Sequence, residues 1–158
     1  DLEEINWAVL WMVAGGFALG VALNETGLAA NLINAIPFNS WPVLLVLIGS
    51  GVICYTLSNF ISNTATAALL VPILAVVGKS MTAELAPLGG VACLLIGIAI
   101  AASMAMCLPI STPPNALAHG TGMIEQKYMA KAGLTVGIIG LILGYGMLIL
   151  LGNIGFFG

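Results

Sequence analysis

Two short polar stretches interrupt an otherwise apolar sequence: Ser-Asn-Thr-Ala-Thr at 62–66 and Ser-Thr-Pro-Pro-Asn at 111–115. The hydroxyl and amide groups of these residues can bind either an anion or a small cation. If each stretch breaks a helix, the next half-helix presents free amide N–H groups and the previous one presents free carbonyls. The two stretches are therefore candidates for a ligand-binding site.

A purely structural role is the alternative, because Ser and Thr in membrane helices often bond to their own backbone. A single cluster would favour that interpretation. Two clusters, each with an asparagine and one with a Pro-Pro pair, favour a site instead. An enzyme is the least expected class, because Ser62 has no base within its segment and nothing would orient His119 towards it.

The elements that position these stretches must be membrane helices. Of the 158 residues 61% are hydrophobic and 6% are charged, whereas a soluble domain has about 25% charged residues. No Lys, Arg, Asp, Glu or His occurs from Thr26 to Gly78, and the lack of arginine leaves no electrostatic basis for nucleic-acid binding. We predict an all-α integral membrane protein, multi-pass in the cell (inner or plasma) membrane and surrounded by the lipid bilayer.

Charges and turn residues divide the chain into four predicted segments. Residues 1–40 hold a spanning helix and a connecting segment, and residues 41–79 a re-entrant helical hairpin with a Ser-Asn-Thr tip. Residues 80–126 form a discontinuous transmembrane helix, and residues 127–158 a C-terminal spanning helix. The last helix has glycines that we expect to form a packing face: Gly133, Gly137, Gly140 and Gly144.

The segment 41–79 allows two interpretations, either two full spans that meet at an aqueous surface or one hairpin that turns back inside the membrane. Its second arm, taken as Ala65 to Gly78, is about 21 Å long as a helix, and the hydrocarbon core is about 30 Å thick. The short arm favours the re-entrant hairpin. The positive-inside tendency places Lys127 and Lys131 on the cytoplasmic side, so that the hairpin enters from the outside.

A second break is predicted at 109–115, because Pro109, Pro113 and Pro114 cannot continue a helix. Non-helical backbone at membrane depth persists only where protein buries it or water lines it. Discontinuous helices of this kind are typical of transport sites.

The charge pattern indicates which ligands could bind. Neither break contains a carboxylate, and no arginine is present to hold an anion. A co-bound sodium ion would supply the missing positive charge, and each ion would improve binding of the other. We expect no transition metal and no organic cofactor, because Cys54, Cys93 and Cys107 lie within apolar runs and His119 has no partner at ligand spacing.

Three longer motifs resemble one known family. The sequences SNTATAALLVPI at 62–73 and LPISTPPNALAHGTG at 108–122, with WMVAGGFALGVALNETGLA at 11–29 upstream, resemble the divalent anion:sodium symporters, the sodium/dicarboxylate (INDY-type) transporters. The resemblance covers nearly the whole chain and corresponds to the second of that family's two inverted repeats. It therefore implies one half of an inverted-repeat transporter, with the N-terminal repeat missing from this chain.

The resemblance also implies roles for individual residues. The implied substrate-binding residues are Ser62, Asn63, Thr64, Thr112 and Pro113. The implied sodium ligands are the Ser58 hydroxyl, the Ile61 carbonyl, the Asn63 side chain and the Ser111 carbonyl. The family often has threonine in place of Ser58, but the hydroxyl is kept.

The function expected from the resemblance is sodium-coupled uptake of C4-dicarboxylates (succinate, malate or fumarate) by a homodimer with an elevator-type mechanism. One alternative is a sodium-independent dicarboxylate exchanger on the same fold. Another is a non-transporting membrane subunit, in which protein would bury both polar breaks.

Overall fold

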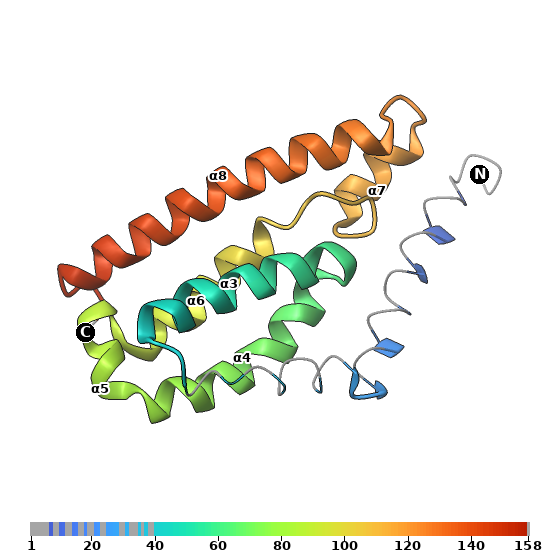
Figure 1. The fold of residues 1–158 in the computed structure, drawn as a ribbon. Helices are drawn as coiled ribbons and strands as arrows, with labels where there is room; N and C mark the ends of the chain where they lie inside the picture. The colour runs from blue at the N-terminus through green and yellow to red at the C-terminus, as the bar shows by residue number, and fades with distance from the viewer. Residues whose placement is uncertain are drawn as a thin grey trace.

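The computed structural model describes residues 40–157 and scattered positions between 7 and 37. Within 40–157 all regular structure is helical (Figure 1). The helices are α3 (Val43–Phe60), α4 (Asn63–Ser80), α5 (Thr82–Leu85), the 3-10 helix η3 (Ala86–Leu88), α6 (Gly90–Ser103), α7 (Pro113–Gly120) and α8 (Gln126–Asn153). The predicted spanning helix and connecting segment at 1–40 lie for the most part outside the described residues.

The helix lengths fit a membrane protein. Among the described residues, α3, α4 and α8 are each long and apolar enough to cross a bilayer, and α5–η3 with α6 forms a further candidate that bends by 68°. The bend lies at Gly89, whose φ of +96° is a backbone conformation that favours glycine. The predicted all-α membrane fold is confirmed, and the bend at Gly89 lies at a different place from the break predicted at 109–115.

Helices α3 and α4 follow one another through a turn that is shorter than expected. Only Ile61 and Ser62 separate the two helices, and both have extended backbone. The Ser62 hydroxyl oxygen accepts a hydrogen bond from the Ala65 N–H at 3.2 Å and so caps α4. The residues from Asn63 to Thr66 therefore belong to the helix and not to the turn.

This cap corrects the predicted length of the second arm. Helix α4 has 18 residues and is about 27 Å long, whereas the arm expected from Ala65 to Gly78 had fourteen. Helix length therefore does not separate a re-entrant hairpin from two full spans, and the re-entrant hairpin stays a prediction.

The second break starts earlier than the prolines indicated. Helix α6 ends at Ser103, residues 104–112 are non-helical, and α7 begins at Pro113. Pro113 and Pro114 occupy the first positions of α7, where a missing N–H costs no helical hydrogen bond. These two prolines therefore begin a helix instead of ending one.

Helix α6 is the centre of the bundle, since it packs against α3, α4 and α8 (Figure 1). The hydrophobic core of the bundle contains apolar side chains from α3, α4 and α6 that are completely buried: Leu47, Leu70, Leu74, Leu94 and Ile98. Helix α8 comes close to the second break through two buried glycines of its predicted packing face. A Cβ atom on Gly133 would lie 2.5 Å from the Met106 carbonyl oxygen, and one on Gly137 would lie 2.9 Å from the Met104 carbonyl oxygen.

Candidate functional site

Three oxygen atoms near the hairpin turn are buried and have no hydrogen-bond partner within the described part of the chain. They are Ser58 Oγ, Asn63 Oδ1 and Thr66 Oγ1. The side chains of Ser58 and Thr66 are completely buried. A buried polar atom without a partner costs about 1–3 kcal/mol, so three of them within nine residues point to a site that holds a ligand.

The hairpin directs two of these oxygens towards α6. Ser58 lies one helical turn after Cys54, whose thiol donates to the Ile98 carbonyl of α6 at 3.5 Å. Thr66 continues the stripe of Leu70, Leu74 and Gly78, and a Cβ atom on Gly78 would touch Leu94 of α6. Both hydroxyls therefore lie on helix faces that pack against α6, near the end where α6 gives way to the break.

Hydrogen bonds bring the hairpin turn and the second break together. Asn59 Oδ1 accepts from the backbone N–H of Cys107 at 2.9 Å. One turn earlier the Tyr55 hydroxyl lies 3.2 Å from the Cys107 sulfur. The end of α3 and the second break, whose bonded residues Asn59 and Cys107 are 48 residues apart, are thus parts of one region.

The other side of the break is bonded to α7. Asn115 Nδ2 donates to the Met106 carbonyl at 2.8 Å and to the Leu108 carbonyl at 3.3 Å. The Ser111 hydroxyl donates to the Leu108 carbonyl, and the Asn115 N–H donates to Thr112 Oγ1 at 3.4 Å. The hydroxyls of Ser111 and Thr112 thus hold the conformation of the break. The atom of Ser111 that was predicted to be a sodium ligand is its backbone carbonyl oxygen, which these hydrogen bonds do not use.

The structure divides the predicted substrate residues into two groups. Asn63 and Thr64 line a hollow of about 500 Å³ between α4 and α6, whose other walls include Ala67, Ala99 and Ser103. Ser62, Thr112 and Pro113 are not among the residues that line it. Ser62 acts as the cap of α4, and Thr112 caps α7.

Two residues with a role in this region were not among the predicted site residues, Asn59 and Thr66. Both lie within the polar cluster from Ser58 to Thr66, and the signal for Thr66 was available: it lies four residues before the apolar Leu70, on the buried face of α4. The partner of Asn59 is a backbone N–H 48 residues away, which no local pattern indicates.

Comparison with known proteins assigns the chain to a family. The profile of the sodium:sulfate symporter transmembrane region matches residues 2–155. The chain therefore belongs to the sodium:sulfate symporter family, which confirms the resemblance inferred from the motifs.

Its relatives are transporters. The chain is 35% identical to the sodium-dependent dicarboxylate transporter SdcS of Staphylococcus saprophyticus over 89% of its own length and 26% of the relative's. It is 36% identical to the sodium-dependent low-affinity dicarboxylate transporter 1 of Caenorhabditis elegans over 85% of its own length and 22% of the relative's. It is also 37% identical to a transporter of Haemophilus influenzae over 87% of its own length and 29% of the relative's. The chain thus spans about a quarter of the length of the curated relatives it matches.

Proposed function

We propose that the protein to which this chain belongs is a sodium-coupled carrier of C4-dicarboxylates such as succinate, malate and fumarate. The observation that carries this proposal is the group of three unpartnered buried oxygens, Ser58 Oγ, Asn63 Oδ1 and Thr66 Oγ1. Neutral oxygen atoms of this kind suit a small hard cation next to unwound backbone. The sodium-dependent dicarboxylate transporters among the relatives support the same pair of ligands.

The sodium site would combine atoms from both breaks. The proposed ligands are the Ser58 hydroxyl, the Ile61 carbonyl, the Asn63 side chain and the Ser111 carbonyl. Ile61 and Ser111 are both buried, and the hydrogen bond from Cys107 to Asn59 ties their two segments together. Thr66 Oγ1 is a further candidate ligand, because it is buried and unpartnered on the same hairpin.

The substrate site would use the N-terminus of α4. Asn63 and Thr64 are its first two residues, and the positive end of an 18-residue helix favours a carboxylate there. Ser62, Thr112 and Pro113 would contact the substrate from the turn and from the second break. Pro113 and Pro114 carry no N–H, so the backbone donors for a carboxylate would come from α4 and not from α7.

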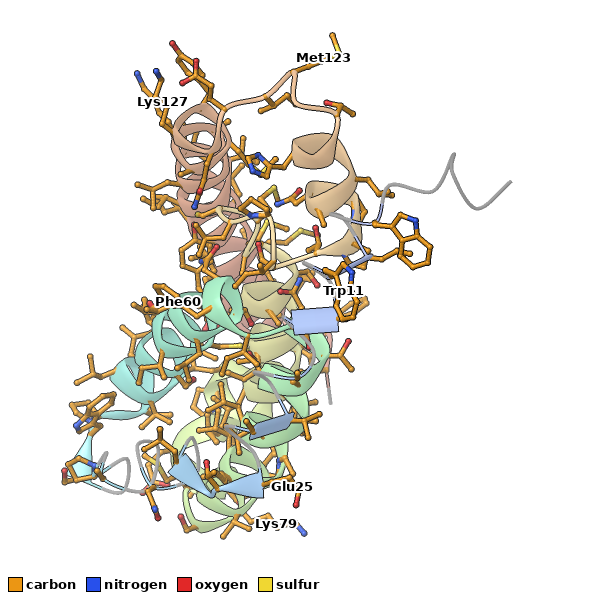
Figure 2. All side chains as sticks on the ribbon, turned by 90° about the vertical axis from the view of Figure 1, so that its right-hand side faces the viewer. Trp11, Glu25, Phe60, Lys79, Met123 and Lys127 are labelled. Carbon is orange, nitrogen blue, oxygen red and sulfur yellow. The ribbon has the colours of Figure 1, made fainter. Side chains whose placement is uncertain are left out.

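The remaining features of the proposal concern the whole carrier. A homodimer in the cell membrane would move its transport domain as an elevator, and an N-terminal repeat would complete the substrate site. A hairpin that ends inside the membrane is supported by Figure 2, in which Phe60 at the end of α3 lies between Lys127 and Lys79 in height. The two lysines lie towards opposite ends of the molecule in that view.

The test is uptake of labelled succinate into proteoliposomes that contain the full-length protein. Uptake should depend on an inward sodium gradient and disappear when choline replaces sodium. Uptake that persists in choline would instead establish a sodium-independent exchanger. A folded protein that takes up no succinate, and whose thermal stability dicarboxylates leave unchanged, would be the non-transporting subunit.

A further inference from the structure

Asn59 joins the hairpin to the second break. One atom of its side-chain amide bonds to the break and the other bonds to its own helix. It lies in the last turn of α3 and is only 7% exposed. Its Oδ1 accepts from the Cys107 N–H at 2.9 Å, and its Nδ2 donates to the Tyr55 carbonyl at 2.9 Å. The second bond anchors the side chain to its own helix, so that the first holds Cys107 at a fixed place relative to α3.

The position of Cys107 matters because it lies in the non-helical segment 104–112. Such a segment has no regular backbone hydrogen bonds of its own and takes its position from its neighbours. Asn115 holds it on the α7 side through the carbonyls of Met106 and Leu108. The hydrogen bond between Cys107 and Asn59 therefore holds the same segment on the hairpin side.

We propose that Asn59 is a positioning residue that aligns the two halves of the cation site. It adjoins Ser58 and lies two residues before Ile61, while Cys107 lies four residues before Ser111. Because both polar atoms of Asn59 already have partners, Asn59 acts on the site through Cys107 and contacts no ion itself. That the aligned ligand is sodium rests on the proposed function; that the two segments are coupled rests on the hydrogen bonds alone.

The first experiment measures the coupling without any ligand. In Asn59→Leu the side chain keeps nearly the same volume but loses the acceptor, so amide hydrogen exchange in the peptide 104–112 should become about tenfold faster. Exchange in 43–58 of α3 should stay unchanged, which separates local release of the break from general loss of stability. Thr56→Ala is the matched control, because the exposed Thr56 hydroxyl donates to Val52 within its own helix.

The second experiment measures the alignment in the full-length protein. Asn59→Leu should raise the sodium concentration for half-maximal uptake about tenfold while the maximal rate at saturating sodium is retained. A residue that only stabilised the fold would instead lower the amount of folded protein and the maximal rate, and leave the half-maximal concentration unchanged.

The outcomes are distinguishable. Unchanged exchange in 104–112 overturns the coupling, and an unchanged half-maximal sodium concentration overturns the positioning role. Should Asn59→Leu not fold, Asn59→Gln carries both measurements, since it keeps the amide but displaces its oxygen by about one carbon–carbon bond. If the wild-type protein shows no sodium dependence, the proposed function fails, while the exchange experiment still decides the coupling.

Discussion

The buried hydroxyl of Thr66 gives a residue-scale prediction in which two effects have opposite signs. Without sodium, Thr66→Val should unfold at the same temperature as the wild type or higher, because the substitution removes a buried polar atom that lacks a partner. With sodium, the wild type should gain stability by ligand binding and the variant should gain less. Thermal unfolding in sodium chloride and in choline chloride measures both effects.

The control for this comparison is Thr56→Val, which removes an exposed hydroxyl from α3. Its response to sodium should equal that of the wild type. A Thr66→Val variant that responds to sodium as the wild type does would remove Thr66 from the cation site.

Asn63 carries the second residue-scale prediction. Asn63→Ala should abolish sodium-driven succinate uptake while the protein still folds, because in the proposed site the Asn63 amide at the start of α4 contacts both ligands. The matched control is Asn153→Ala, at the exposed end of α8. Uptake at the wild-type rate in Asn63→Ala, measured on equal amounts of folded protein, would exclude Asn63 from the site.

Residue types alone indicated the polar cluster but not the role of each member. Ser58 and Asn63 were expected to be sodium ligands because the resemblance to the family implied it, and the structure leaves the side-chain oxygens of both unpartnered within its described part. Asn59 looked equivalent to them in the sequence. Its use depends on the path of residues 104–112 past the end of α3, which is a tertiary feature.

At the scale of elements, the approach of α8 to the second break can be tested with two glycines of one helix. A Cβ atom on Gly133 would lie 2.5 Å from the Met106 carbonyl oxygen, whereas one on Gly146 would have nothing within 4 Å. Gly133→Ala should therefore lower the free energy of unfolding by about 1–3 kcal/mol. Gly146→Ala should be neutral or raise it by up to about 1 kcal/mol, because alanine favours the helix.

Denaturant unfolding of the two variants in the same detergent gives this comparison, and transport adds a functional measure. Gly133→Ala should also reduce uptake, since its Cβ displaces the segment that carries Ser111. Equal stability of the two variants would mean that α8 does not pack on the break as the structure has it.

The sequence indicated some helix boundaries and not others, for physical reasons. The prolines indicated the second break but were expected to end a helix, whereas Pro113 and Pro114 begin α7, where a missing N–H costs no helical hydrogen bond. They did not indicate that α6 would end at Ser103, since the residues from Met104 to Leu108 are as apolar as the helix before them. The start of α4 could have been predicted, because a serine before a helical run is a common cap.

At the scale of the whole molecule, the prediction concerns the depth of the hairpin turn. Phe60 is 56% exposed at the end of α3 and lies between Lys127 and Lys79 in height (Figure 2). A spin label attached through Phe60→Cys in the full-length protein should therefore collide more often with lipid-soluble oxygen than with an aqueous nickel complex. A label attached through Lys79→Cys should show the reverse preference.

The two interpretations of the hairpin differ in this measurement. If α3 and α4 were two full spans, the labels at 60 and 79 would both lie in water, on opposite sides of the membrane. Equal aqueous accessibility at the two positions would then replace the re-entrant hairpin by two spans.

The two prolines that open α7 have a consequence for selectivity. A helix whose first two residues lack an N–H, and whose next N–H is bonded to its own cap, still carries its positive potential. It therefore attracts negative charge without fixing how that charge is oriented. The α4 end, with N–H groups and the Asn63 and Thr64 side chains, can do both. Recognition within this chain would thus be strict in geometry for one carboxylate and permissive for the other, and a carrier built this way would accept diacids that differ in the shape of their far end.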